Sequence, residues 1–341
     1  MNSNGHSENS KKPEVVVVTG ASAGLGRAIV REFARHGAHI GLIARDHHRL
    51  ESTVREVSEL GGEAVPVPAD VTNPERMQEA ADETESHFGP IDIWINNAMT
   101  TVFAPFLEVT PEEYKRATEV TYLGAVWGTM AALRKMQPRN RGSIVQIGSA
   151  LAYRSIPLQA SYCGAKHAIM GFTDTLRTEL IHDRSNIHIT MVHMPALNTP
   201  QFEWCRTRMP RRPQPVPPIY HPEVAARAVY WAAHCRRREV YLGISTVASI
   251  LGTKLAPALL DRYLGRTGYD AQQTAEPVDG QRPDNLIEPV PGEFAAHGRF
   301  DDRSFNNSFQ FWLDTHRTVS VTAPLVMLSL TYFFLKQWRN R

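Results

Sequence analysis

The 341-residue sequence is poor in cysteine and carries little excess charge of either sign. Its three cysteines, Cys163, Cys205 and Cys235, form no CxxC pair, so the sequence indicates no disulfide framework and favours a reducing, cytoplasmic location. Lysine and arginine together number 37 against 35 acidic residues, which gives no reason to expect binding to nucleic acid. The polar N-terminus lacks the apolar segment of a secretory signal. We also predict no metal site from the sequence.

Strand-like and helix-like segments alternate through about the first 243 residues. Short apolar runs at 15–18, 40–44 and 91–95 predict buried strands, and the segments between them place apolar residues on one helical face. This alternation is typical of β-α-β units, which form a parallel sheet with helices on both faces. We therefore expect an α/β fold.

A glycine-rich turn at Thr19–Gly26 follows the first predicted strand directly. Glycine lets the backbone turn sharply and approach a ligand closely, and the helix that begins near Leu25 points free N–H groups toward that ligand. Between a buried strand and a helix, such a turn is typical of a site for the pyrophosphate of a dinucleotide. A purely structural turn is the alternative. The predicted cofactor-binding residues of this turn are Gly20, Ser22, Ala23, Gly24, Leu25 and Gly26.

The end of the second predicted strand bears on which dinucleotide binds. An acidic residue about 20 positions after the turn typically binds the ribose 2′-hydroxyl of NAD, whereas arginine suits the 2′-phosphate of NADP. Arg45 directly follows the last strand residue, which favours NADP. Asp46 keeps NAD possible, because it could reach the 2′-hydroxyl or pair with Arg45. Asp70 and Val71 are predicted beside the adenine, with a loop-capping role for Asp70 as the alternative.

Three residues form a candidate catalytic group. Tyr162 and Lys166 are four positions apart in a predicted helix, so their side chains share a face, and Ser149 ends the preceding strand. Tyrosine has an ordinary pKa of about 10, and a neighbouring ammonium lowers this pKa by favouring the phenolate. Tyr162 could then exchange a proton with an alcohol or carbonyl oxygen while a hydride moves to or from the cofactor. Ser149 would hydrogen-bond the same oxygen and fix its position.

Together these motifs resemble those of the short-chain dehydrogenase/reductase family over about residues 14–243. The resemblance implies a Rossmann-like, doubly wound parallel sheet of about seven strands and a nicotinamide cofactor. It also implies that Tyr162 is the acid/base group, while Lys166 lowers the pKa of Tyr162 and holds the nicotinamide ribose. Both residues thereby count as cofactor-binding residues, and the resemblance adds Asn97, Ala98 and Thr199 to that set.

The sequence departs from the family pattern at Met99, where a glycine is usual, and at Thr121, where a catalytic asparagine is usual. The asparagine holds a water in the proton relay to the lysine, and a threonine hydroxyl has fewer bonding groups with which to do so. We expect Thr121 to take that place as a fourth catalytic residue. The predicted function is an NADP-dependent oxidoreductase that interconverts an alcohol and a carbonyl. A non-catalytic dinucleotide-binding sensor or scaffold is the alternative.

The segment 196–220 is predicted to close the substrate site. It contains Phe202 and Trp204, which suggest an apolar small-molecule substrate. Leu151 and Tyr153 are also expected to line the pocket. The arginines of the segment could bind an acidic group or lipid headgroups, or could simply be solvated; they are Arg206, Arg208, Arg211 and Arg212.

The pattern divides the chain into a disordered tail at 1–13, a dinucleotide-binding catalytic domain at 14–245 and a C-terminal extension at 246–317. The extension is expected to hold one or two helices around Pro257 and an irregular part rich in proline, glycine and aspartate. A hydrophobic helix at 318–335 and a basic tail at 336–341 complete the chain.

The 18 residues of 318–335 carry no charge. A helix of this length reaches about 27 Å, close to the ~30 Å apolar thickness of a bilayer. We predict membrane association through this helix, with docking onto the protein itself or a partner as the alternative. The family resemblance further implies a homodimer or tetramer formed through helices at 111–136 and 161–182.

Overall fold

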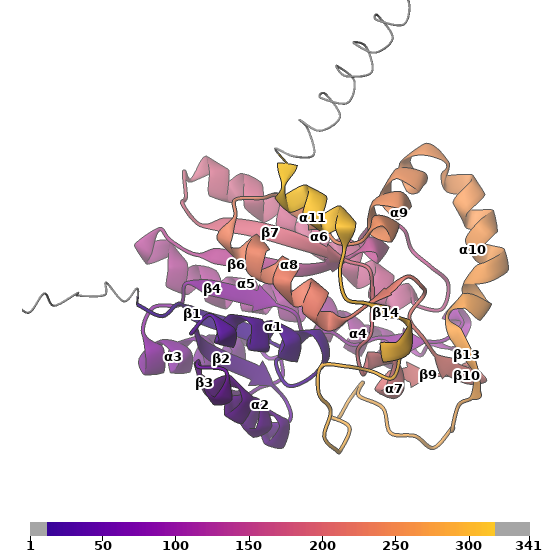
Figure 1. The fold of residues 1–341 in the computed structure, drawn as a ribbon, viewed down its shortest axis with the longest axis horizontal. Helices are drawn as coiled ribbons and strands as arrows, with labels where there is room; N and C mark the ends of the chain where they lie inside the picture. Colours follow the sequence, from indigo (N-terminus) through magenta and orange to yellow (C-terminus); the bar gives the residue numbers. More distant parts are fainter. Residues whose placement is uncertain (1–11, 318–341) are drawn as a thin grey trace, which may run out of the picture.

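The structure is a computed structural model that describes residues 12–317 (Figure 1). A parallel sheet of seven strands lies at its centre, in the order β12-β7-β6-β4-β1-β2-β3. The prediction of an α/β fold with a doubly wound sheet is therefore confirmed. The strands are β1 (Val15–Thr19), β2 (His39–Ala44), β3 (Glu63–Pro68), β4 (Ile93–Asn96), β6 (Ser143–Ser149), β7 (His188–Met194) and β12 (Glu239–Tyr241).

Helices cover both faces of the sheet, as Figure 1 shows. The four valines of β1 alternate between two buried apolar clusters, one on each face, which is why the central strand is a continuous apolar run. One cluster packs α1 (Gly24–Arg35), α2 (His47–Glu59) and α8 (Pro222–His234) against the sheet. The other packs α3 (Pro74–Phe88), α5 (Gly124–Met136) and α6 (Ala160–His182).

The strand order reverses next to β1, and this reversal positions the site. From β1 the chain builds outward to β3 and then crosses back to β4 on the other side of β1. In open α/β sheets, ligands bind at such a switch point, outside the carboxyl ends of the strands. Thr19, Asn96 and Ser149 end β1, β4 and β6 at this edge.

The helix predicted at 111–136 forms, but with one irregular turn. After α4 (Pro111–Thr118), which begins with a capping box between Thr110 and Glu113, the chain passes through a π-helical turn at Glu119–Leu123 before α5. Such turns occur frequently at functional sites. The turn contains Thr121, the predicted relay residue.

The segment 196–220 is more ordered than a simple loop. It holds β8 (Ala196–Leu197), α7 (Gln201–Trp204), β9 (Arg206–Thr207), β10 (Arg211–Pro213) and β11 (Ile219–Tyr220). β9 pairs with β5 (Val102–Phe103), and β8 pairs with β11. The first pairing joins the segment to the chain that follows β4, and the second joins the two ends of the segment to each other.

The C-terminal extension begins with the two helices expected around Pro257, α9 (Ile244–Leu255) and α10 (Pro257–Ala271). In Figure 1 this pair projects beyond one end of the sheet. The part expected to be irregular is mostly so, apart from the end of β13 (Gln273–Pro277) and a 3-10 turn at Asp301–Arg303. β13 pairs with β10, and β14 (Ser304–Phe305) pairs with β11. The short helix α11 (Phe309–Thr315) follows.

None of the helices within residues 12–317 is long and apolar enough to cross a membrane. The anchor predicted at 318–335, the basic tail and the first eleven residues lie outside the described residues. Membrane association, the division into domains and the homodimer therefore stay predictions.

Candidate active site

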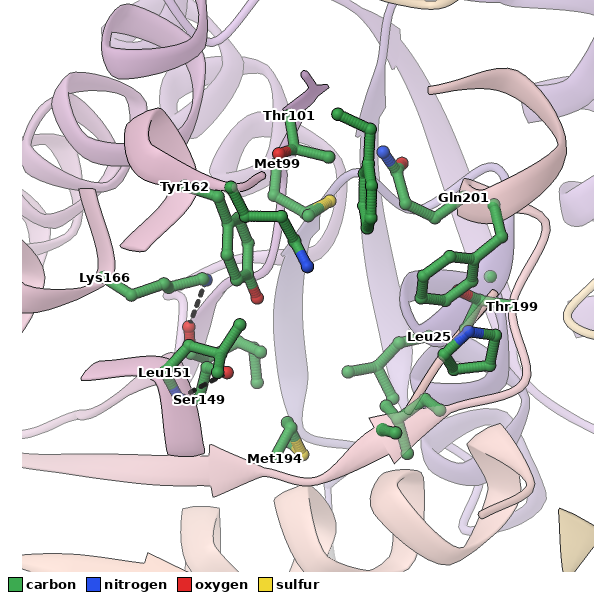
Figure 2. Close-up of a pocket in the computed structure, with 18 of the residues that line it drawn as sticks. Leu25, Met99, Thr101, Ser149, Leu151, Tyr162, Lys166, Met194, Thr199 and Gln201 are labelled. Carbon is green, nitrogen blue, oxygen red and sulfur yellow. Dashed lines mark hydrogen bonds between the residues drawn. The ribbon is translucent and has the colours of Figure 1, made fainter. Parts of the chain in front are cut away.

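A cavity of about 570 Å³ lies at the carboxyl edge of the sheet (Figure 2). Every predicted cofactor-binding residue lines it: Gly20, Ser22, Ala23, Gly24, Leu25, Gly26, Arg45, Asp70, Val71, Asn97, Ala98, Tyr162, Lys166 and Thr199. Ser149 lines it as well. Thr121 is not among the cavity-lining residues of the described chain. In Figure 2 the serine, tyrosine and lysine lie on one wall, and Leu25 and Thr199 lie on the opposite wall.

The candidate catalytic group comes from two neighbouring elements. Ser149 ends β6, and α6 carries Tyr162 and Lys166 one turn apart. The Lys166 Nζ atom lies 5.5 Å from the centre of the Tyr162 ring and donates a hydrogen bond of 2.6 Å to the carbonyl of Ile147. The lysine is 2% exposed, so its ammonium has little contact with solvent. The three predicted residues are thus brought together as the spacing suggested.

Burial dominates the titration of this group. It lowers the pKa of the Lys166 ammonium to about 7. It also raises the pKa of Tyr162 above its ordinary value, against a smaller lowering by the Ser149 side chain. In the protein by itself, burial therefore favours the neutral phenol, so lowering of the tyrosine pKa needs further positive charge in the cavity.

The glycine-rich turn is fastened to the end of β4. Asn97 donates from its side-chain amide to the Thr19 carbonyl at 2.9 Å, and the Thr19 hydroxyl accepts the backbone N–H groups of Asn97 and Ala98. A Cβ atom on Gly26 would lie 2.0 Å from the Gly20 carbonyl oxygen, so only glycine fits there. These contacts hold the turn open at the N-terminus of α1, where N–H groups favour a phosphate.

Thr121 is completely buried in its π-helical turn. Its hydroxyl accepts the Thr100 backbone N–H at 3.0 Å and donates to the Thr100 carbonyl at 2.9 Å. The one hydroxyl proton is therefore already used, and a relay water could only donate to this oxygen. The contact fixes the chain just after Met99, whose side chain reaches into the cavity in Figure 2.

Residues 284–301, here called the strap, cross the cavity where the adenosine of a dinucleotide is expected. Arg45 donates to the carbonyls of Asn285, at 2.8 Å, and Ile287. Arg116 donates to the carbonyl of Leu286 at 3.1 Å, and the Leu286 side chain is fully buried. The strap is thus held by hydrogen bonds from Arg45 and Arg116 to three consecutive backbone carbonyls.

The strap also touches the glycine-rich turn. The Gly24 N–H donates to the Ala295 carbonyl at 3.0 Å, and Arg27 donates to the Phe294 carbonyl at 3.0 Å. Figure 1 shows the strap as the orange and yellow chain that passes α7 on its way to β14. Because Asn285, Pro289 and Val290 line the cavity, the strap forms one of its walls.

Asp70 is predicted beside the adenine or as a loop cap, and the structure shows the capping contact, whereas the position beside the adenine stays a prediction. It lines the cavity, accepts the Thr72 N–H at 3.0 Å and pairs with Arg116 at 2.5 Å. Burial opposes its ionisation, but Arg116 and Thr72 more than offset this effect and hold the pKa of Asp70 below its usual value.

Sequence reasoning missed Arg49, which also lines the cavity. The residue is 6% exposed, and its Nη2 atom pairs with Asp46 at 2.9 Å. Its Nε and Nη1 atoms are buried and have no hydrogen-bond partner among residues 12–317. The guanidinium lies over the rings of Trp204 and Phe294, 5.5 and 5.6 Å from their centres, and burial lowers its pKa. No local signal marks it, because an arginine early in a helix is usually exposed.

Asp46, which kept NAD possible, is already engaged. Its Oδ1 atom caps α2 by accepting the Arg49 backbone N–H at 3.0 Å, and its Oδ2 atom pairs with the Arg49 side chain. Both carboxylate oxygens therefore stabilise the start of the helix and its buried arginine.

The substrate end of the cavity is largely apolar. Phe202 and Trp204 line it as predicted, and so does Leu151, whereas Tyr153 points away and donates to Glu239 at 2.7 Å. α10 adds Leu260, Tyr263 and Leu264 to the lining. The four arginines of segment 196–220 are paired with acidic residues, namely Glu113, Asp284, Asp270 and Glu276. These pairings favour a structural role for the arginines over recognition of an acidic substrate.

Comparison with known proteins identifies the family of the chain. The family described as short chain dehydrogenase matches residues 14–208. The uncharacterized oxidoreductase YxnA of Bacillus subtilis is 30% identical over 317 residues, which cover 92% of this chain and 88% of YxnA. The 11-beta-hydroxysteroid dehydrogenase-like 3 of Arabidopsis thaliana is 35% identical over 196 residues, or 56% of this chain and 61% of that protein. The 3-dehydrosphinganine reductase of Danio rerio is 33% identical over 195 residues, or 55% and 57%. Of these three similarities, only the first covers most of the chain.

Proposed function

The chain belongs to the short-chain dehydrogenase family and is an NAD(P)-dependent oxidoreductase, and we propose that it uses NADP to interconvert an apolar alcohol and its carbonyl compound. The observation that carries the proposal is the convergence of Ser149, Tyr162 and Lys166 in one cavity with the glycine-rich turn. The bound nicotinamide supplies the hydride in reduction and accepts it in oxidation.

The roles proposed for the catalytic residues follow from their positions. The Tyr162 hydroxyl donates a proton to the carbonyl oxygen during reduction and takes it back during oxidation. The Ser149 hydroxyl hydrogen-bonds the same oxygen and holds it within reach of the phenol. Lys166, close to the Tyr162 ring, stabilises the phenolate when charged and binds the ribose hydroxyls. We propose that Thr121 takes part only by positioning the Met99–Thr100 backbone and by accepting a hydrogen bond from a relay water.

The preference for NADP rests on two arginines with different tasks. Arg45 donates hydrogen bonds to backbone carbonyls of the strap. Arg49, by contrast, has two buried side-chain nitrogen atoms without a hydrogen-bond partner in the described chain. A buried, incompletely paired guanidinium is costly, and the 2′-phosphate of NADP would satisfy it with charge-assisted hydrogen bonds. Both carboxylate oxygens of Asp46 are engaged by Arg49, which disfavours a hydrogen bond from Asp46 to the 2′-hydroxyl of NAD. We therefore propose Arg49 as the main ligand of the 2′-phosphate, with Arg45 beside it.

The proposal of an apolar substrate is supported by the lining of the cavity and by the arm formed by α9 and α10. Leu259 and Tyr263 are 65% and 60% exposed, and Tyr263 belongs to the cavity wall. An apolar molecule would cover such side chains on its way to Tyr162. Two of the similar proteins are named for a steroid and a sphingoid compound, which are substrates of this character.

The test is turnover by the purified chain with a panel of ketones and aldehydes that increase in apolar size. We expect oxidation of NADPH to exceed oxidation of NADH, and kcat/KM to rise with apolar size. Tight NADPH binding without turnover of any compound would instead favour the sensor or scaffold alternative. A preference for NADH would refute the proposed role of Arg49.

A further inference from the structure

Two histidines and an aspartate converge away from the catalytic group, where the strap meets the N-terminus of α8. His221 caps α8, and His297 and Asp301 belong to the strap. One possible ligand atom from each of the three lies within 4.8 Å of the other two. The two imidazole rings are 4.9 Å apart between centres.

The two histidines present ring nitrogens to the same carboxylate oxygen. The Nδ1 atom of His297 lies 2.6 Å from Asp301 Oδ1, and that of His221 lies 3.5 Å from it. His221 is 8% exposed, and its Nδ1 atom has no hydrogen-bond partner in the described part of the chain. A buried ring nitrogen without a partner is unfavourable, and a metal ion held by the three side chains would engage it.

Each of the strap ligands has an outer partner of the kind that supports metal ligands. The Nε2 atom of His297 lies 2.9 Å from the Glu223 carboxylate, which orients the ring and leaves Nδ1 facing the aspartate. Asn198 donates from its side-chain amide to Asp301 Oδ1 at 2.7 Å. Carboxylates behind ligating histidines, and donors to ligating carboxylates, fix ligands and strengthen metal binding.

We propose that His221, His297 and Asp301 bind a divalent transition-metal ion, for which Zn²⁺ fits the donor set best. Imidazole with carboxylate suits zinc, whereas calcium and magnesium prefer all-oxygen sites. Tetrahedral zinc with bonds of about 2.0–2.2 Å separates its ligands by roughly 3.4 Å. The distance between His221 and Asp301 already matches this value, and that between His297 and Asp301 must widen by roughly 0.8 Å. On binding, the ion replaces the proton on His297 Nδ1, and this proton is released to solvent. Water completes the coordination, because the Asp301 side chain is 60% exposed.

The bound ion would link the strap to the N-terminus of α8, because His221 precedes this helix and the other two ligands lie in the strap. Asn198, its outer partner, also accepts the Gly298 N–H through its carbonyl at 3.2 Å and the Phe300 N–H through its side chain at 3.0 Å. Thr199, the next residue, lines the cofactor cavity. Metal binding therefore holds down the carboxyl end of the segment that covers the dinucleotide site. The proposal rests on none of the hydride-transfer chemistry.

The experiment measures zinc binding by the full-length chain after removal of any affinity tag. The protein is stripped with a chelator and titrated with Zn²⁺ against a chromophoric competitor. We expect one ion per chain and at least a tenfold loss of affinity in H221A, H297A and D301N. Asp302 and His87 are exposed and offer matched controls, so D302N and H87A should bind as the wild type does. Folding of each variant is checked by circular dichroism.

Hydrogen exchange then tests whether the bound ion holds the strap in place. Zinc should slow amide exchange in residues 284–301 of the wild type but not of D301N. Stoichiometric binding that D301N and H221A leave intact would overturn the site, because the ion would then sit elsewhere, for example at a cysteine. No binding at micromolar zinc would overturn it as well, and would show a hydrogen-bonded histidine–aspartate network without metal. Unchanged exchange in the strap would contradict the claim that metal binding holds the strap in place.

Discussion

The sheet domain and the C-terminal extension build the same cavity by different means. The sheet domain places Ser149, Tyr162 and Lys166 on a strand end and a long helix, both supported by large apolar clusters. The extension lines the cavity with residues of the exposed helices α9 and α10 and of the strap. The strap is held mainly by hydrogen bonds from side chains within residues 14–245. The difference leads us to propose that residues 14–245 carry the hydride-transfer chemistry, while the extension influences which molecules enter the cavity and how fast they leave.

The largest expected effect lies in the sheet domain. Tyr162→Phe removes the transferable proton and leaves the ring in place, so kcat should fall by roughly 10²–10⁴-fold. The dissociation constant for NADPH, followed by protein fluorescence, should change little. Wild-type kcat in this variant would show that Tyr162 is not the acid/base group.

Arg49→Gln should weaken NADPH binding by roughly 10- to 100-fold, because it removes charge-assisted hydrogen bonds to the 2′-phosphate. NADH binding should change far less. Arg55 lies on the same helix and is exposed, so Arg55→Gln is the matched control and should leave both constants unchanged. Equal loss for the two cofactors would attribute the effect to lost packing of Arg49 on its aromatic neighbours.

Leu286→Ala tests the strap. The fully buried side chain packs with Val102, Ala104 and Ala117, so its truncation should loosen the strap and raise the dissociation constant for NADPH by roughly 3- to 10-fold. Cofactor release, measured by stopped flow, should become faster while kcat at saturation changes little or rises. The neighbouring Ile287 is 50% exposed, and Ile287→Ala should behave as the wild type does. An unchanged release rate in the Leu286 variant would contradict a covering role for the strap.

The last expected effect concerns the pH dependence of stability without cofactor. The pKa of Lys166 is about 7 in the folded protein and about 10.4 in the unfolded chain. Between these values the unfolded state binds the extra proton, so this residue makes stability rise with pH, by up to about 1.4 kcal/mol per pH unit. Below pH 7 both states are protonated and this dependence disappears. Denaturant unfolding of Lys166→Met should therefore show a shallower rise than the wild type between pH 7 and 10. Parallel curves would contradict the shift.

The sequence allowed much of the fold and of the candidate site to be predicted, because their signals are local. A β-branched run next to a glycine-rich turn, and a tyrosine and a lysine four residues apart, depend on neighbours along the chain. The same local reasoning assigned Arg45 to the 2′-phosphate without the strap that now holds it. It also could not find Arg49, whose burial depends on Trp204 and Phe294 from distant segments.

The alternation of strands and helices by itself determined the doubly wound sheet, and with it the edge at which the candidate catalytic residues meet. Only the tertiary structure decided what the extension does. His221, His297 and Asp301 show no ligand spacing in the sequence, and they meet because β14 pairs with β11 and draws the strap against α8. Periodicity encodes elements and their faces, whereas the course of an irregular segment depends on hydrogen bonds to residues more than a hundred positions away, such as those of Arg45 to Asn285 and Ile287.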